Sequence, residues 1–311
     1  SIDYSSFTPF EIRDQNLFNL IHGQSLPTNA RLNSTAQARW SSSLIITNTI
    51  NIENNGEESI FLDYESYRFN LSYQYGLNED WNLKFDLPVL HQGGGMFDSA
   101  IDKWHDFFGL PRGKRPSVEH DQYNISYHSG TQSLLYLDEA STRLGDIQLA
   151  LARRVLEKDD TSMSIWAGIK LPTGDTDKLS GSGSADFSAW LALNQQLSTN
   201  WLLNLNAGTV ILGGDTYQEM PLADHVLYGH VMLGWLLNEN IQLKVQLQGH
   251  TSYYENTRLD ILADTFFMSF GTTINISRCQ QLDFAVSEDI KVDSTPDISL
   301  LINWRSYSPG C

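Results

Sequence analysis

The sequence predicts an all-β fold, a transmembrane antiparallel β-barrel of twelve strands. Apolar and polar residues alternate with a period of two in segments of about ten residues, which is the pattern of strands with two different faces. The clearest segment spans residues 241–254, where Leu243 and Val245 share one face and Lys244 and Gln246 share the other. A barrel in a membrane needs such strands, because one face meets lipid and the other a polar lumen.

The connections between these segments alternate in length. Five are short and polar, at residues 77–81, 156–161, 197–201, 236–241 and 277–282. Six longer ones lie around residues 50–60, 91–143, 173–184, 214–224, 255–264 and 292–296. Short turns at one end and long loops at the other are typical of transmembrane barrels. The count implies twelve strands within residues 32–307, with both chain ends on the short-turn side and the first strand, within 32–50, the least distinct.

Aromatic residues on the apolar face gather near the short turns, as an interfacial girdle requires. These residues are Tyr75, Trp81, Trp201, Trp235 and Trp304. A second girdle at the opposite ends is expected from Phe187, Tyr253 and Phe266. The alternative is a soluble all-β protein, which would turn its apolar rows inward and show no aromatic ring at one level.

The amino-acid composition limits the classes of partner that the chain can bind. The chain has 20 Lys and Arg against 37 Asp and Glu, a net charge of −17, which argues against nucleic-acid binding because that needs a basic face. No run approaches the roughly 18 apolar residues of a membrane-spanning helix. The expected partners are outer-membrane lipid and lipopolysaccharide and a small-molecule solute, in the outer membrane of a Gram-negative bacterium. No protein partner is indicated.

Two segments depart from the strand pattern. Residues 1–31 precede the barrel and are expected to enter the lumen as a plug or to lie across the periplasmic mouth. Within the long loop 91–143, apolar residues recur at helical spacing and predict a short amphipathic helix over 97–108. Its apolar face comprises Phe97, Ile101, Trp104 and Phe108. The helix is either a lid that meets apolar ligands or a cap packed on the rim.

The two cysteines fall on the same side of the predicted barrel. Cys279 lies in the last short turn and Cys311 follows the last strand, and these strands are neighbours. A disulfide bond between them is therefore expected in an oxidising compartment. The alternative is two unpaired thiols.

Two stretches resemble a known family. The segment FEIRDQNLFNLIHGQSLP and the segment GGGMFDSAIDKWHDFFGLPRGKR are similar to an uncharacterised proteobacterial family, domain of unknown function 3187, over the whole chain. The family's Pro after Arg-Asp-Gln-Asn is Leu17 here. More loosely, RLGDIQLALARRVL, IKLPTGD and GSGSAD resemble outer-membrane proteins linked to phenol meta-pathway operons. That likeness implies an outer-membrane barrel and points to a hydrophobic or aromatic cargo.

The sequence motifs do not indicate an enzyme, and no catalytic residue, cofactor or metal site is predicted. The Gly-Ser-rich stretch in residues 169–190 leads into a strand without the Gly-Lys-Ser/Thr of a phosphate loop, and it lacks EF-hand spacing. It predicts an outer hairpin loop, with Asp175 and Asp177 at the rim. A lipid-modifying enzyme needs a Ser–His pair on the membrane side, whereas His230 and His250 fall on the lumen side. A rim site remains the third option.

The inward face carries the functional prediction. By alternation, the lumen is expected to be lined by Arg68, Lys84, Asp86, Asp146, Lys170, Asp186, Lys244, Gln246, Gln248, His250, Asp283 and Arg305. Such mixed charges either fill a closed lumen with ion pairs or flank a polar path. We expect an outer-membrane channel for a small, apolar or aromatic solute. The alternative is a non-conducting barrel with a plugged lumen that acts through its extracellular loops.

Overall fold

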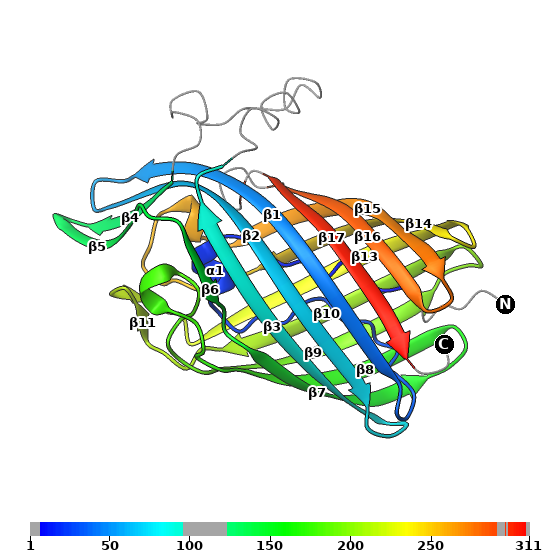
Figure 1. Ribbon diagram of the computed structural model, residues 1–311. Coiled ribbons are helices and arrows are strands. Elements are labelled where there is room, and N and C mark those ends of the chain that lie inside the picture. Colours follow the sequence, from blue (N-terminus) through cyan, green and yellow to red (C-terminus); the bar gives the residue numbers. More distant parts are fainter. Residues whose placement is uncertain (1–6, 96–122, 291–295, 297, 309–311) are drawn as a thin grey trace.

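Twelve long strands form a closed antiparallel barrel (Figure 1), which confirms the predicted fold class. The computed structural model describes residues 7–95, 123–290, 296 and 298–308. In ring order the strands are β1 (Ala38–Asn54), β2 (Glu58–Gly76), β3 (Trp81–Gly93), β7 (Gln148–Glu157), β8 (Thr161–Lys170), β9 (Asp186–Gln196), β10 (Trp201–Ile211), β13 (His225–Asn238), β14 (Ile241–His250), β15 (Thr265–Ser277), β16 (Gln280–Asp289) and β17 (Ile298–Ser308). The ring closes where β1 pairs with β17, with Ala38 opposite Ser308 and Asn48 opposite Ile298.

The outer end of the barrel differs from the prediction in two places. Instead of a loop over 50–60, β1 and β2 extend beyond the ring and meet at a tight turn over 55–57. Instead of a long loop without strands, the chain after residue 122 forms β4 (Asn124–Ser129) and β5 (Gln132–Leu137), and β4 pairs with the outer part of β2. β6 (Ser141–Leu144) then pairs with the outer part of β3. The alternating pattern was too short in these pieces to separate strand from loop.

Smaller elements complete the outer end. The hairpin of β11 (Thr216–Tyr217) and β12 (Met220–Pro221) lies between β10 and β13. One short 3-10 helix, η3 (Thr176–Lys178), lies between β8 and β9, and another, η4 (Asp260–Leu262), between β14 and β15. These loops lie at the outer end of the barrel (Figure 1).

The two faces of the wall have opposite character. On β14, Val245 is 46% exposed, whereas Lys244 and Gln246 are 2% and 0% exposed. At the short-turn end the rings of Trp201 and Trp235 stack at 5.8 Å between centroids, on adjacent strands. The amphipathic wall and this aromatic pair give the barrel the outer surface that a membrane-spanning protein needs.

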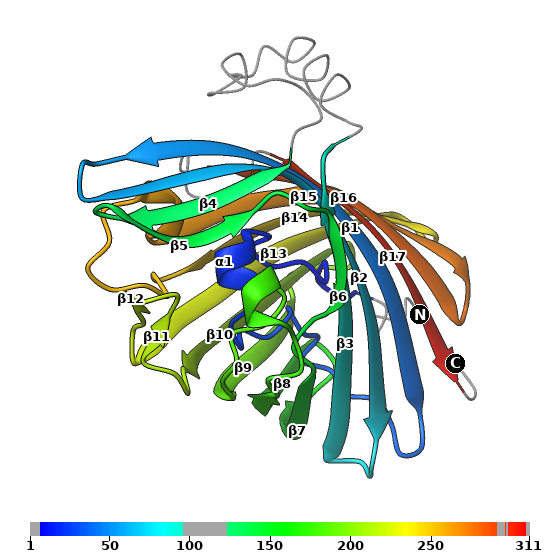
Figure 2. The ribbon, with the colours of Figure 1, turned by 60° about the vertical axis from the view of Figure 1, so that its left-hand side comes forward.

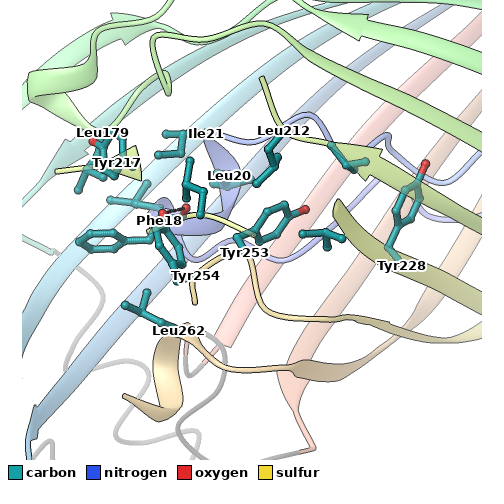
Figure 3. Packing of buried hydrophobic residues seen from close by; sticks show 14 of the residues in the cluster. Phe18, Leu20, Ile21, Leu179, Leu212, Tyr217, Tyr228, Tyr253, Tyr254 and Leu262 are labelled. Atoms are coloured by element: carbon teal, nitrogen blue, oxygen red, sulfur yellow. Dashed lines mark hydrogen bonds between the residues drawn. The ribbon is translucent and has the colours of Figure 1, made fainter. Parts of the chain in front are cut away.

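Tyr253 corrects the predicted outer girdle. Phe187 and Phe266 are 54% and 44% exposed, but Tyr253 is 1% exposed. The physical reason is that β14 ends at His250, so the alternation of faces ends there too. The following loop then turns inward and places the Tyr253 ring over the lumen (Figure 3).

The N-terminal residues run through the interior of the ring (Figure 2). Residues 7–30 are all buried, and this stretch includes the one-turn helix α1 (Leu17–Leu20). Phe7 packs on Leu202 and Leu236 near a short turn, and Asn33 bonds to Asn82 near another, whereas α1 lies at the outer end. Residues 7–33 therefore form a hairpin inside the barrel, and we call them the lumen segment.

Some expected features lie outside the described residues. These are the predicted helix with Phe97, Ile101, Trp104 and Phe108, and the second cysteine, Cys311. Cys279 lies in the turn between β15 and β16, where its carbonyl accepts a hydrogen bond from Tyr307 N of β17 at 3.0 Å. The Cys279–Cys311 bridge therefore stays a prediction.

Across the described residues, the structure contains no helix both long and apolar enough to cross a membrane.

Candidate functional site: the occupied lumen

The first limb of the lumen segment lies against the inner face of β14 and bonds to its side chains. Gln246 Oε1 accepts a hydrogen bond from Phe10 N at 2.9 Å, and Gln246 Nε2 donates to the Phe10 carbonyl at 3.1 Å. Lys244 Nζ donates to the Thr8 carbonyl at 2.7 Å and lies 4.2 Å from the centroid of the Phe10 ring. A side-chain amide thus replaces the backbone partner that an extended chain would otherwise lack.

The motif Arg13-Asp14-Gln15-Asn16 builds the turn of the hairpin. Arg13 Nη1 donates to the carbonyls of His22 and Gln24 at 2.8 and 2.7 Å, and Nη2 donates to that of Leu20 at 2.6 Å. Asn16 caps α1, since its side-chain oxygen accepts from Phe18 N at 3.1 Å. One arginine from the first limb therefore holds the backbone of the second limb.

The turn is tied to the wall by His250, which lies at the end of β14. His250 Nε2 lies 3.0 Å from Asp14 Oδ2, and Nδ1 lies 2.9 Å from the Thr251 carbonyl. Asp14 also accepts from Asn19 Nδ2 at 2.6 Å. The neighbouring inward residue Gln248 is buried, and its Nε2 has no hydrogen-bond partner in the described part of the chain.

Aromatic rings from the loop over 251–264 cover the turn (Figure 3). The His22 ring stacks on Tyr253 at 4.6 Å between centroids. Tyr254 Oη donates to the Phe18 carbonyl at 2.6 Å, so His22 Nε2, 3.2 Å away, must be the donor toward Tyr254. Burial raises the pKa of Tyr254 well above its ordinary value, which keeps this hydroxyl a donor. These rings close the outer end of the lumen, and we call them the aromatic seal.

The second limb meets a row of asparagines. Asn206 Oδ1 accepts from both the N and the Oγ1 of Thr28, at 2.8 and 2.9 Å. Asn206 and Asn204 donate back to the Thr28 carbonyl at 3.0 and 3.2 Å. Trp190 Nε1 donates to Thr28 Oγ1 at 2.9 Å, and Asn194 Nδ2 donates to Asn29 Oδ1 at 2.6 Å. The second limb is thus held to β9 and β10 by hydrogen bonds to their side chains.

Lys170 joins the second limb, the wall and an outer loop. Its Nζ lies 2.9 Å from Asp146 Oδ2 and 3.0 Å from Asp186 Oδ2, and it donates to the Ile21 carbonyl at 2.7 Å. Asp186 also accepts from Gly23 N at 2.9 Å. All three charged side chains are buried, so none can lose its partner without a large desolvation cost.

The Gly-Ser-rich loop over 171–185 binds a carboxylate of the protein itself. Asp146 accepts hydrogen bonds from Gly174 N at 2.8 Å and from Ser182 N at 3.1 Å. Asp175 caps η3 and lies 3.4 Å from Arg143, at the exposed rim. The loop is therefore a folded part of the outer mouth, and two of its backbone N–H groups bind a carboxylate of the barrel.

A second buried charge cluster lies on β14, β16 and β17. Asp283 Oδ1 is 2.7 Å from Arg305 Nη2 and 3.5 Å from Lys244 Nζ, and accepts from Thr273 Oγ1 at 2.6 Å. Glu11 of the lumen segment lies nearby, where it accepts from Ser41 Oγ at 2.5 Å. The cluster links β14, β16 and β17, and Lys244 also connects it to the Thr8 carbonyl of the lumen segment.

The last predicted residues lie on β2 and β3. Lys84 is paired with Asp86, which also accepts from Ser72. Arg68 is buried and has no hydrogen-bond or ion-pair partner among the described residues. All twelve predicted residues are buried, at most 8% exposed, and their role in lining a path stays a prediction.

Sequence reasoning missed the residues that hold the lumen segment. The missed group includes Arg13, Asp14, Asn16, Asn194, Asn204 and Asn206. A signal existed for the last three, since asparagines at every second position of inward faces imply partners that need amide hydrogen bonds. Arg13 stood in the motif that carried the family resemblance, but nothing local shows that its partners are backbone carbonyls. No group of three or more His, Cys, Asp or Glu side chains suited to a metal ion occurs in the described part of the chain.

A closed ring of amphipathic strands, with aromatic residues at one rim and a polar interior, defines the class: a transmembrane β-barrel of the bacterial outer membrane. The chain belongs to the family described as protein of unknown function (DUF3187), whose sequence profile matches residues 3–306. This confirms the resemblance noted in the sequence. No curated protein matches the chain in sequence.

Solved structures with a similar fold are channels and porins. The COG4313 outer membrane channel from Pseudomonas putida F1 has a TM-score of 0.61 and 13% identity, covering 92% of this chain and 100% of that one. The NanC porin has a TM-score of 0.48 and 8% identity, covering 88% and 100% of the two chains. The CymD monoaromatic hydrocarbon channel has a TM-score of 0.43 and 11% identity, covering 97% and 94%. At these identities the first of them establishes a shared fold, and the others are weaker likenesses.

Proposed function

We propose that the protein is an outer-membrane channel for a small solute and that the lumen segment is its plug. The observation that carries this proposal is the polar interface between the segment and the wall. Along both limbs the contacts run through amide, lysine and hydroxyl groups, for example at Gln246, Lys244 and Asn206. Apolar contacts below the outer seal involve Phe7 and Phe10 of the first limb and Ala30 and Leu32 of the second.

A polar interface suits a plug that has to move. When such a segment leaves, the asparagine and lysine groups of the wall can bond to water, so their separation costs little net free energy per hydrogen bond, about 0.5–1.5 kcal/mol. Opening an apolar interface would instead cost about 25 cal/mol for each Å² of apolar surface that becomes exposed to water. Because both ends of the segment lie at the short-turn end, the hairpin can withdraw without threading its turn through the wall.

The aromatic seal supports an apolar or aromatic solute. Phe18, Tyr253, Tyr254 and Tyr217 lie together at the outer end of the lumen (Figure 3). A solute with an aromatic face that enters here meets rings with which it can stack. Passage then continues through the polar lumen or out through the wall.

One observation favours the second candidate, a non-conducting barrel that acts through its extracellular loops. Two cavities beside the lumen segment measure only about 10 Å³ each, which is room for one water molecule. In this conformation the described lumen is filled, and the β4–β5 hairpin and the long outer ends of β1 and β2 offer surface outside the ring (Figure 1).

Liposome swelling separates the two candidates. The full chain and a variant without residues 1–31 are reconstituted and tested with benzyl alcohol, benzoate and a small sugar. Solute flux through the shortened barrel that exceeds flux through the full chain supports a channel with a plug. An absence of flux in both would exclude the channel and leave the binding barrel.

A cross-link in the full chain tests whether the segment moves. The double variant Thr28→Cys with Asn206→Cys joins two residues whose side-chain oxygens, Thr28 Oγ1 and Asn206 Oδ1, lie 2.9 Å apart. Oxidation is expected to abolish flux and reduction to restore it, while the two single variants serve as controls. Equal flux in the oxidised and reduced forms would show that solute passes without movement of this limb.

A further inference from the structure

Arg68 is a buried arginine without an acceptor. It lies in the middle of β2, points to the inner side and is 8% exposed. No hydrogen bond or ion pair joins its guanidinium to any described residue, although the group carries five N–H donors. A buried charge of this kind is costly unless something accepts from it.

Arg68 borders a closed space rather than packed side chains. The cavity it lines measures about 10 Å³, and Arg13, Asp86, Asp146 and Gln148 also line it. Arg13 comes from the lumen segment and Arg68 from the wall, so the cavity lies at the interface between them. Both guanidinium groups carry a positive charge toward it.

The carboxylates at this cavity are already satisfied. Asp86 is paired with Lys84 and accepts from Ser72. Asp146 is paired with Lys170 and accepts from two backbone N–H groups of the loop over 171–185. Neither carboxylate is therefore the missing partner of Arg68.

The charges around the cavity balance, but the guanidinium donors outnumber their acceptors. The positive groups are Arg13, Arg68, Lys84 and Lys170, and the negative groups that interact with them are Asp14, Asp86, Asp146 and Asp186. Arg13 donates to three neutral carbonyls, and Arg68 donates to no described residue. The unused donors of Arg68 border this space, which therefore suits a negatively charged acceptor.

We propose that this cavity is a binding site for one small monovalent anion, held between Arg68 of the wall and Arg13 of the lumen segment. The volume admits a single acceptor of about the size of a water molecule. Among common anions, a free halide comes nearest to that size. An anion here would bind two elements that otherwise repel each other, and so would hold the plug closed. The site stands whatever solute the barrel passes.

The test uses the full chain in detergent. Crystals grown with bromide are expected to show an anomalous peak in the cavity between Arg68 and Arg13. An uncharged water in the cavity, with no bromide peak, would overturn the proposal. This measurement needs no variant, so it stands even if substitutions disturb folding.

Thermal melting followed by circular dichroism tests the selectivity of the site. Chloride and bromide are compared with formate and sulfate, which are both larger than the cavity, at equal ionic strength. A rise in Tm with the halides alone supports the site, and equal responses to all four anions contradict it.

Substitutions of Arg68 test whether this residue is responsible for the rise in Tm. Arg68→Met should abolish the rise in Tm, and Arg68→Lys should weaken the apparent affinity about tenfold, because it keeps the charge but loses the fork of donors. Arg153→Met is the matched control, since Arg153 is an exposed arginine on the outer wall, 5.5 Å from the Trp81 ring centroid. An unchanged response in Arg68→Met would refute the assignment.

Discussion

Replacement of Arg13 by methionine should release the lumen segment without unfolding the barrel. Arg13 Nη1 and Nη2 make three hydrogen bonds, of 2.6–2.8 Å, to the carbonyls of Leu20, His22 and Gln24. Methionine keeps most of the apolar stem and removes every donor. The turn of the hairpin then lacks the group that joins its two limbs, while the strand ladder of the barrel is untouched.

The magnitude follows from these bonds. A hydrogen bond to a charged group contributes about 1.5–3 kcal/mol, so three amount to roughly 4.5–9 kcal/mol before compensation. The variant no longer buries a guanidinium, which returns several kcal/mol. We therefore expect the docking free energy of the segment to fall by about 3 kcal/mol, which raises its released fraction more than about a hundredfold.

Limited proteolysis measures that fraction. A glutamate-specific protease reaches Glu11, which is 3% exposed, only when the segment leaves the lumen. Where opening is fast, the cleavage rate follows the population of the open form. Arg31→Met is the control, because the 2.7 Å ion pair of Arg31 with Glu157 is partly exposed and contributes about 0–1 kcal/mol. Equal cleavage rates in Arg13→Met and wild type would refute the reasoning, as would a loss of the folded barrel on electrophoresis.

Three further outcomes are expected. Lys170→Met leaves two buried carboxylates without their cation and should lower the free energy of unfolding in vesicles by about 3–5 kcal/mol, whereas Arg143→Met, at an exposed pair, should change it by less than about 1 kcal/mol. Mass spectrometry under non-reducing conditions should find Cys279 bridged to Cys311, and two free thiols would contradict the predicted disulfide. Trp235→Ala removes a stacked ring from the girdle and should destabilise the inserted barrel by about 1 kcal/mol beyond the lost apolar area, as denaturant titration in vesicles would show. An unchanged titration would mean that the ring pair contributes nothing at the interface.

The strand pattern made the barrel predictable because the alternation of apolar and polar residues within one strand shows which residues face lipid and which face the lumen. Along β14 successive residues face lipid and lumen in turn. The apolar Val245 and the charged Lys244 therefore indicate their own sides of the wall without information from any other segment. The pattern failed where the ladder ends. Tyr253 follows the last paired residue of β14, and from there the loop, not the alternation, decides where its ring points.

The contents of the lumen could be predicted only in outline. An N-terminal stretch without strand periodicity suggested a plug, but the pairing of Phe10 with Gln246 joins residues 236 positions apart and leaves no local trace. The same holds for Lys170, whose charge predicted a lumen position but not its two carboxylates and the Ile21 carbonyl.

By itself, the sequence determined the class of fold, the twelve strands of the barrel ring and the two faces of each, since the period of two and the turn lengths are local properties of the chain. Only the tertiary structure decided which polar groups find partners. It gave Arg13 three carbonyls and left Arg68 with none, because hydrogen bonding inside a closed barrel depends on how distant segments meet. The same contacts determine what the lumen holds.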